Sequence, residues 1–267
     1  MKKRIISSVA LSVVLIAAIC IGIITNKNAK TVTDNNEEYE FTEADWSEVL
    51  LCGEAHDSEK CLEAELELWG ELYAQGARHL FMEDGYSTTA FLNEWMKADN
   101  DDILDDLYDD WIGTQMHSIN YLNFFHRIKE EFPETVFHGT DIDHLYYRTG
   151  QRYLDKIISE GKKGSREYND AVRNYQQGEK YYQMMISALN ADAADNYREL
   201  CMAQNFIREY ERLRNEKIMG IYGAAHTDPG AIAWGGTVDC MAKQLYKKYG
   251  AKITTIDVSE DYIMKSH

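Results

Sequence analysis

The sequence predicts an α/β fold with a mainly parallel central sheet flanked by helices. Short apolar runs without strict alternation recur along the chain, as is typical of strands that are buried on both faces. Segments of helical periodicity separate these runs, and such alternation favours a parallel sheet. The stretch 146–216 differs, because it has no apolar run and is rich in Tyr, Arg, Glu, Gln and Ala. We expect it to form two or three long helices inserted over the active-site end of the sheet.

Residues 1–30 form a candidate targeting segment. They include five basic residues and no acidic one, and the basic cluster Lys2-Lys3-Arg4 precedes a mostly apolar stretch at 5–25. As a helix that rises ~1.5 Å per residue, this stretch spans about 30 Å, the thickness of the hydrocarbon core of a bilayer. We expect an anchor in the cell membrane, with the basic end inside and the following domain outside. A cleaved signal peptide, which would leave the domain secreted, is the alternative.

Length and composition predict a polar linker at 31–38 and a single domain at 39–267. A chain of 267 residues, 45% of them hydrophobic and 27% charged, is long enough to bury a sizeable core and is not that of a disordered protein. The 28 basic and 45 acidic residues give a net charge of −17 at pH 7. This excess of acid argues against a nucleic-acid partner, whose phosphates require a basic surface.

Five apolar runs are the predicted strands, and helical segments lie between them. Runs of this length suit strands in the interior of a parallel sheet. The predicted strands are 49–51, 80–82, 136–137, 218–222 and 253–258. Outside the insertion, the predicted helices are 60–73, 88–97, 118–131 and 237–249.

The acidic run 99–110 (DNDDILDDLYDD) is predicted to be a solvated helix face or a loop. Several carboxylates close together raise the possibility of a calcium site, because this hard cation prefers oxygen ligands. A loop that starts at Asp99 has no Gly at its sixth position and no Glu at its twelfth. The run therefore lacks the EF-hand pattern.

The cysteines leave the redox state of the domain open. Cys20 lies in the apolar targeting segment, and the domain contains Cys52, Cys61, Cys201 and Cys240. Their spacing does not determine a pairing, so two disulfides and four buried free thiols both fit the sequence. Cys52 lies four residues before His56, which permits a cysteine nucleophile, but the predicted strand direction buries Cys52.

Polar residues follow four of the predicted strands. Glu54 and His56 follow the first strand, Glu83 the second, Asp141 the third and His226 the fourth. Ligands bind at the carboxyl ends of the strands in an open α/β sheet. We therefore expect these five side chains to converge on one crevice.

Glycines support this expectation. Gly53, Gly139 and Gly223 each come directly after an apolar run, where the backbone must turn tightly or approach a ligand closely. Taken singly, an acidic residue after a strand is often a helix cap, and a histidine there is often a hydrogen-bonded structural residue. Their joint occurrence favours a functional site.

Two imidazoles and several carboxylates make a mixed nitrogen and oxygen site. Such donors suit Mn²⁺, Zn²⁺, Co²⁺ or Fe²⁺, and the predicted ligands are His56, Glu83, Asp141 and His226. Without a metal, Glu54, His56, Glu83 and His226 can supply a general base and acid for attack by water. Hydrolysis is the implied reaction class in both cases. The chain contains no G-x-S-x-G motif, which argues against a serine nucleophile.

Two G-x-x-H motifs carry a family resemblance. GEAH at 53–56 and GAAH at 223–226, each after a predicted strand and with Glu83 between them, resemble the superfamily of erythromycin esterases, ChaN-like proteins and TraB/Tiki proteins. LCGEAHD at 51–57 is similar to the ChaN-like opening motif, and FLNEW at 91–95 and GTD at 139–141 resemble later segments of the esterase-like branch. The resemblance covers about 47–145 and about 216–258, without the helical middle.

The resemblance implies an α/β fold whose paired histidines and strand-end glutamate form the active site. The superfamily includes hydrolases that open a macrolide ester and metal-dependent peptidases, and ChaN-like members have been associated with haem. Carried over, His56 and His226 are metal ligands or the water-activating base, and Glu54 and Glu83 are a ligand and a base in either order. The first motif has one residue between Glu and His, where esterase-type members usually have two, and the helical middle is shorter. Both departures argue against macrolide specificity.

These observations predict a membrane-anchored extracellular hydrolase, metal-dependent, that cleaves an ester or amide bond of a small molecule or peptide. The alternative is a haem- or metal-binding protein without turnover, because Tyr and His are common axial ligands of haem and the chain has 18 tyrosines. A third possibility is a scaffold with a degenerate site, whose helices at 146–216 bind a protein partner.

Overall fold

The structure is a computed structural model that describes residues 48–187, 191–214 and 216–259. The predicted targeting segment and linker lie outside these ranges, as does the start of the predicted domain. Among the residues described, no helix combines the length and the apolar character needed to cross a bilayer.

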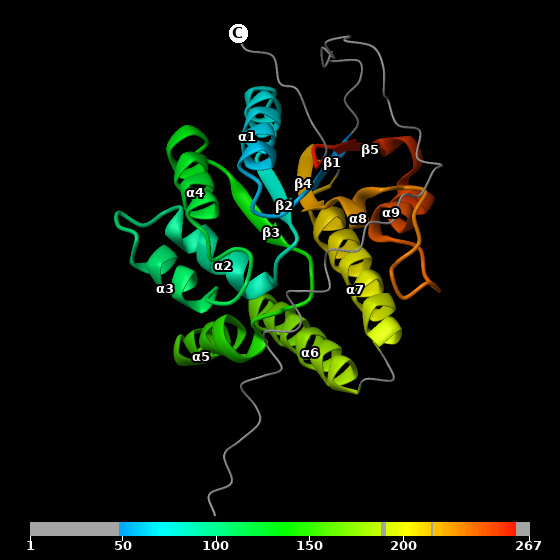
Figure 1. Cartoon of the computed structure of the whole chain (residues 1–267). Coiled ribbons are helices and arrows are strands. Elements are labelled where there is room, and N and C mark those ends of the chain that lie inside the picture. The colour runs from blue at the N-terminus through cyan, green and yellow to red at the C-terminus, as the bar shows by residue number, and fades with distance from the viewer. Residues whose placement is uncertain (1–47, 188–190, 215, 260–267) are drawn as a thin grey trace, which may run out of the picture. The chain divides into compact units, whose positions relative to one another are not determined.

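The centre of the domain is a sheet of five parallel strands in the order β3-β2-β4-β1-β5 (Figure 1). The strands are β1 (Val49–Glu54), β2 (His79–Met82), β3 (Val136–Gly139), β4 (Ile218–Gly223) and β5 (Ile253–Asp257). Glu54 pairs with Gly223, and Met82 pairs with both Ile221 and Gly139. This register brings the carboxyl ends of β1 to β4 to the same edge of the sheet.

Both faces of the sheet are buried, which explains why its strands lack a polar alternation. Leu50 and Cys52 pack into the core on one face, whereas Val49 and Leu51 pack into the core on the other. Successive side chains of a strand point to opposite faces, so a strand between two helical layers must be apolar at every position. The predicted α/β fold with its parallel sheet is confirmed.

The first face is covered mainly by α1 (Glu59–Ala74), α2 (Tyr86–Trp95), α3 (Asp102–Asp110) and α4 (Ile119–Glu131). Ser58 and Ser118 begin α1 and α4, because each hydroxyl accepts a hydrogen bond from a backbone N–H of the first turn. The acidic run predicted as a helix face or loop forms α3, with Leu104 and Leu107 facing the core.

The second face is covered by α7 (Ala191–Arg212) and α9 (Met241–Tyr249), which pack on the sheet through Phe206 and Leu245 among others. The prediction placed the start of the last helix at residue 237, four residues too early. The backbone N–H groups of Thr237 and Val238 instead donate to the side chain of Asn196 in α7. These bonds hold the chain in a loop until Met241.

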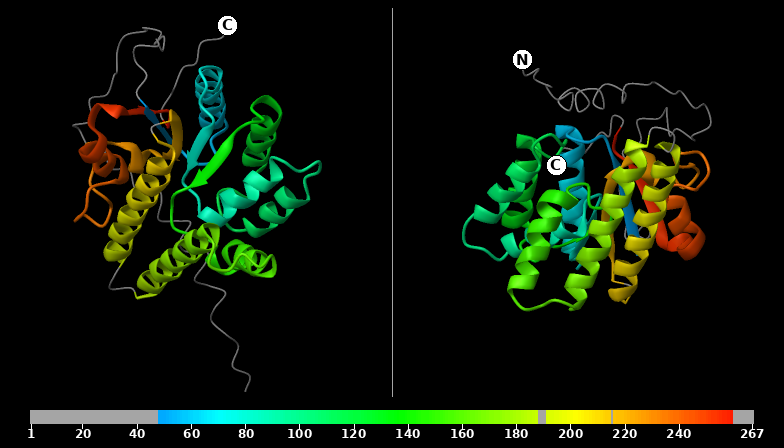
Figure 2. Two further views of the ribbon diagram at one scale, coloured as in Figure 1. Left: turned by 180° about the vertical axis from the view of Figure 1, so that it is seen from behind. Right: turned by 90° about the horizontal axis from the view of Figure 1, so that it is seen from below.

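The helical stretch predicted at 146–216 contains η2 (Tyr146–Gly150), α5 (Gln151–Ser159), α6 (Arg166–Ile186) and α7 (Figure 2). Asn174 of α6 accepts from the N–H of Tyr86 and donates to the carbonyl of Asp141, both at 2.7 Å. These two bonds tie α6 to the segments that follow β2 and β3. Part of the stretch thus lies at the carboxyl end of the sheet, and α7 extends along one face. The short helices α8 (Ala224–Thr227) and η3 (Gly250–Lys252) are the remaining elements of the described residues.

Two further sequence-based expectations are refined. The strands β1, β3 and β4 continue through Gly53, Gly139 and Gly223, so these glycines lie inside the strand ends rather than after them. The four cysteines of the domain are buried free thiols, so of the two alternatives the free thiols are confirmed and the two disulfides are not. Burial raises the pKa of Cys52 well above its ordinary value, so this thiol is not an activated nucleophile.

Candidate active site

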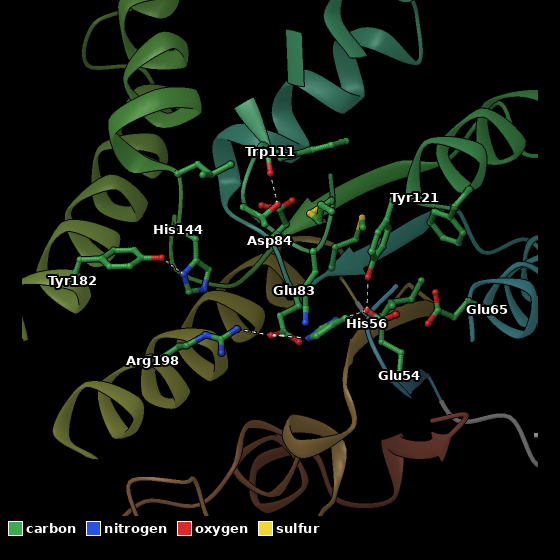
Figure 3. Close-up of a pocket in the computed structure, with 17 residues that line it drawn as sticks. Glu54, His56, Glu65, Glu83, Asp84, Trp111, Tyr121, His144, Tyr182 and Arg198 are labelled. Carbon is green, nitrogen blue, oxygen red and sulfur yellow. Dashed lines mark hydrogen bonds and ion pairs between the residues drawn. The ribbon is translucent and has the colours of Figure 1, made fainter. Parts of the chain in front are cut away.

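Four of the five predicted site residues lie together at the carboxyl ends of β1, β2 and β4, and Figure 3 shows three of them, Glu54, His56 and Glu83. Glu54 is the last residue of β1, and His56 follows it by two positions. Glu83 comes directly after β2, and its N–H donates to the carbonyl of Ile221 in β4. His226 belongs to α8, which begins where β4 ends. The convergence expected from the sequence is therefore present for the two histidines and two glutamates.

Glu83 is the centre of the arrangement. Its Oε1 atom lies 3.9 Å from His56 Nε2 and 3.4 Å from His226 Nε2, and it accepts a hydrogen bond from Arg198. Its Oε2 atom accepts from the N–H of Gly223 at 2.6 Å. Burial by itself would raise the pKa of Glu83, but the charges of His226 and Arg198 hold it well below its usual value. Glu83 is thus an ionised carboxylate in the interior.

Gly223 is the glycine whose small size the site requires. A Cβ atom at this position would lie 3.0 Å from His56 Nε2 and 3.3 Å from Glu83 Oε2. The backbone N–H of residue 223 reaches the Glu83 carboxylate because no side chain intervenes. The expected close approach of the backbone therefore involves the Glu83 carboxylate of the candidate site.

Glu54 and His56 form the first carboxylate–histidine pair. His56 Nδ1 lies 2.8 Å from Glu54 Oε1, which also accepts from the hydroxyl of Tyr121 at 3.0 Å. Burial lowers the pKa of His56, but the hydrogen bond to Glu54 and the charge of Glu83 outweigh burial and raise it above its usual value. With Nδ1 bound to a carboxylate, Nε2 is the nitrogen left for proton transfer.

Glu199 and His226 form a second pair of the same kind. His226 Nδ1 is hydrogen-bonded to Glu199 Oε1, and Glu199 Oε2 accepts from the N–H of Met241 at 2.6 Å. Burial lowers the pKa of His226, yet the charge of Glu83 and the bond to Glu199 raise it to about 10. His226 is therefore an imidazolium at neutral pH and bridges two carboxylates.

Asp141 joins the site through Arg198. The guanidinium donates to Asp141 Oδ2 at 2.6 Å from Nη2 and at 3.0 Å from Nε, and it also donates to Glu83. His144 Nε2 lies 3.0 Å from the same Asp141 oxygen. Burial opposes ionisation, but Arg198 and His144 lower the pKa of Asp141 to about 2. Asp141 is an anchor for Arg198 and does not approach the two imidazoles of the pairs.

A cavity of about 340 Å³ opens beside the first pair. Glu54, His56, Glu83 and Arg198 line it, whereas His226 and Asp141 are not among its lining residues. The side chain of His56 is 33% exposed and that of His226 only 15%. A bound molecule can thus reach His56, with His226 behind Glu83. The remaining walls are aromatic, apolar, polar or acidic residues from the strand ends, α1, the 111–116 segment, α4, the loop after β3 and α6.

The donors present do not fit the predicted divalent metal. Arg198 donates to both Glu83 and Asp141, so a permanent cation already pairs with two of the predicted ligands. Across the three segments that the structure describes, no group of three or more His, Cys, Asp or Glu side chains is placed to hold a metal ion. Metal dependence remains a prediction for experiment, and no step proposed below passes through a metal.

Sequence reasoning missed the residues that α7 and α4 supply. Arg198 and Glu199 lie inside a 22-residue helix with no motif around them, and Tyr121 lies in the first turn of α4. The signal available in the sequence was helical periodicity. Glu199 is an acidic residue that this periodicity places on the same face of α7 as Met202 and Phe206. An acidic residue in an apolar helix face indicates a partner in the interior.

Comparison with known proteins finds similarity in structure and not in sequence. No protein-family model matches the chain, and no curated protein matches it by sequence. An erythromycin esterase, the EreC mutant in its open conformation, superposes with a TM-score of 0.59 at 12% identity over 79% of this chain and 69% of that chain. The chain has the fold of this esterase.

Two further solved structures share the fold. A Bacillus cereus protein matches with a TM-score of 0.55 at 12% identity, over 78% of this chain and 65% of its own. A succinoglycan biosynthesis protein matches with a TM-score of 0.57 at 11% identity, over 79% of this chain and 65% of its own. The chain thus spans about two thirds of the length of these structures. The fold implied by the family resemblance is confirmed, and activity is a separate question.

Proposed function

We propose that the protein is a hydrolase that cleaves an ester or amide bond of a small molecule or peptide, with His56 as the base that activates water. The observation that carries this proposal is the environment of His56, which lines the cavity while its Nδ1 binds Glu54. A carboxylate on one ring nitrogen fixes the orientation of the ring and leaves the other nitrogen as the base. The shared fold with an erythromycin esterase supports the reaction class.

The chemical step uses groups that line the cavity. Nε2 of neutral His56 takes a proton from water while the water oxygen attacks the carbonyl carbon. The carbonyl oxygen becomes negatively charged, and the guanidinium of Arg198 supplies positive charge at the cavity wall. His56 then returns the proton to the leaving alcohol or amine as the C–O or C–N bond breaks.

The second pair serves a positioning role in this proposal. His226 and Arg198 both contact Glu83 Oε1, so the carboxylate holds two cations in fixed places. Asp141 binds the same guanidinium from another side. Preorganised charges of this kind stabilise charge that develops in a transition state, because they need no rearrangement when the reaction occurs.

An assay with the full-length protein tests the proposal. Wild type is expected to hydrolyse members of a panel of aryl esters and amides, and His56→Ala to reduce kcat by about 100-fold to 10,000-fold. His126→Ala is the matched control, because this histidine of α4 packs against Trp95 and is not among the cavity residues. Equal rates for wild type and His56→Ala on every substrate would refute the proposal.

The N-terminal segment is the basis for a proposal about the cellular location of the protein. If the basic and apolar residues of 1–30 form the anchor that their pattern predicts, the hydrolase is held at the outer surface of the cell membrane. Fractionation with protease treatment of intact cells tests this, since an external domain is digested while the membrane is closed.

Haem binding is the second candidate function, and His144 with Tyr182 is the observation that favours it. Both line the cavity, and His144 Nδ1 lies 3.0 Å from the Tyr182 hydroxyl. Histidine and tyrosine are known axial ligands of haem. A Soret band that appears on haem titration and is lost in His144→Ala or Tyr182→Phe would support this function, and hydrolysis without any such band would count against it.

A further inference from the structure

Glu65 is an acidic residue on the buried face of α1. Cys61, Leu68 and Leu72 lie one or two helical turns away on the same face, and all three are buried. Glu65 is 0% exposed, and among the described residues no nitrogen or hydroxyl donor lies within hydrogen-bond distance of either of its carboxyl oxygens. A glutamate is almost never fully buried without a partner, so this one requires an explanation.

The partner of Glu65 is Glu54 of the first carboxylate–histidine pair. The two side chains are hydrogen-bonded to each other, and Figure 3 shows the carboxyl group of Glu65 turned toward Glu54. Glu54 Oε1 already contacts His56 Nδ1 and the hydroxyl of Tyr121. Glu54 Oε2 is buried, and no nitrogen or hydroxyl donor of the described residues reaches it. Oε2 is therefore the Glu54 oxygen that is left to accept a hydrogen bond from Glu65.

A hydrogen bond between two carboxyl groups requires that one of them keeps its proton. A carboxylate has no proton to donate, and two like charges in contact repel each other in the interior. Burial, together with the charge of Glu54, raises the pKa of Glu65 well above its ordinary value. Glu54 instead accepts from Tyr121 and pairs with His56, and such contacts stabilise a carboxylate. Glu65 is thus the neutral acid and the donor.

We propose that Glu65 is a positioning residue: as a neutral carboxylic acid it donates a hydrogen bond to Glu54 Oε2 and so holds Glu54 in place against His56. This inference rests on the proposed hydrolase function, because Glu65 acts through the base of that mechanism. A donor at Oε2 fixes the plane of the Glu54 carboxylate while Oε1 contacts the imidazole. The rate of a histidine base depends strongly on the carboxylate that orients it.

Substitutions in the full-length protein test the role of Glu65 in turnover. Glu65→Met has a side chain of similar length without the donor, and it should lower kcat by about tenfold or more. Glu65→Gln keeps a donor in its amide group and should retain most of the activity that Glu65→Met loses. Glu63→Met on the same helix is the control, because Glu63 is exposed, pairs with Arg127 and is not among the cavity residues. Equal kcat values for Glu65→Met and wild type, or equal losses in the two Glu65 variants, would overturn the proposal.

A spectroscopic measurement on the wild-type protein locates the proton without any assay. When ¹³C is placed at Cδ of the glutamates, the NMR signals of ionised and neutral carboxyl groups separate, and buried aspartates such as Asp84 do not contribute. A neutral glutamate signal is expected at pH 7, and it should be absent in Glu65→Gln. If every glutamate is ionised at pH 7, the proposal is refuted.

The ring of His56 reports the effect on the base and separates this inference from the proposed function. In protein labelled with ¹⁵N-histidine, the Nδ1–H signal of His56, assigned through His56→Ala, should persist in Glu65→Gln and shift in Glu65→Met. If this shift occurs but wild type hydrolyses no ester or amide, the hydrolase proposal fails and the positioning of His56 through Glu54 stands. If the enzyme is active but its His56 signal is the same in wild type and Glu65→Met, the hydrolase proposal stands and the role of Glu65 is refuted.

Discussion

The pairs Glu54–His56 and Glu199–His226 contain the same two residue types but lie in different surroundings. His56 lines the cavity and is one-third exposed, and its partner Glu54 also accepts from Tyr121. His226 is enclosed between Glu83 and Glu199, next to Arg198. A histidine between two buried carboxylates keeps its proton, whereas a histidine with one close carboxylate and an open side can exchange it. Position alone thus separates a candidate base from a fixed cation.

The largest expected effect comes from replacing the carboxylate of the first pair, and the carboxylate of the second pair is its comparison. Glu54→Gln should lower kcat by about 100-fold or more, because the base loses the charge that orients it and stabilises its protonated form. Glu199→Gln should lower kcat by less than about tenfold, because His226 keeps its contact with Glu83, although the single Gln oxygen can accept from only one of His226 and Met241. Steady-state kinetics on one ester measures both. Equal losses in the two variants would remove the distinction between the pairs.

The free energy of unfolding should depend more on the second pair than on the first, which is the reverse of the order expected for kcat. His226→Gln leaves two buried carboxylates without their shared cation, and we expect it to lower the free energy of unfolding by about 3 kcal/mol. His56→Gln changes a one-third exposed side chain, and its cost should be below about 1 kcal/mol. Urea denaturation followed by circular dichroism measures the difference. A larger loss for His56→Gln would contradict the structural account.

The two pairs should also differ in how they make stability and activity depend on pH. The pKa of His226 is raised to about 10 from its ordinary 6.5, so its contribution to stability is complete below pH 6.5 and is lost as the pH rises towards 10. The free energy of unfolding should therefore decline over that range, and less so in His226→Gln. Activity should rise with pH through a value above 6.5, because His56 must lose its proton to act as a base. If activity instead rises with a midpoint below pH 6.5, His56 is excluded as that base.

The smallest expected effect is that of a chelator. Arg198 already pairs with Glu83 and Asp141, so treatment with EDTA should change kcat/KM by less than about twofold and leave both pairs intact. Elemental analysis of the purified protein before and after treatment is the accompanying measurement. A rate that falls with metal content and returns with added Zn²⁺ or Mn²⁺ would restore the metal-dependent alternative.

The difference between the pairs also marks the limit of sequence-based prediction. Glu54, His56, Glu83 and His226 were found because apolar runs identify parallel strands, and the carboxyl ends of parallel strands meet at one edge. Glu199 and Arg198 were not found, because they come from the middle of a helix whose orientation on the sheet depends on side-chain packing. Asp141 was placed at the correct edge, but its side chain binds Arg198 of α7 and His144 rather than His56 or His226. Strand order and helix rotation decide such details, and neither is encoded in a local motif.

The cavity illustrates the same limit. Its walls combine residues of β1 and β2 with Trp111, which follows α3, and Phe124 of α4. Trp111 and Phe124 appear in the sequence as ordinary core residues. Trp111 Nε1 is buried with no acceptor among the residues that the structure describes. The type of residue does not reveal this, because it says nothing about whether a donor is satisfied.

Helix α7 gives the site and the core a common support. Met202 and Phe206 pack on the sheet, and Arg198 and Glu199, one turn earlier, bind Glu83 and His226. A rotation of this helix about its axis would move its apolar side chains and its charged side chains together. A substitution that adjusts Arg198 or Glu199 therefore cannot readily avoid disturbing the packing beneath them.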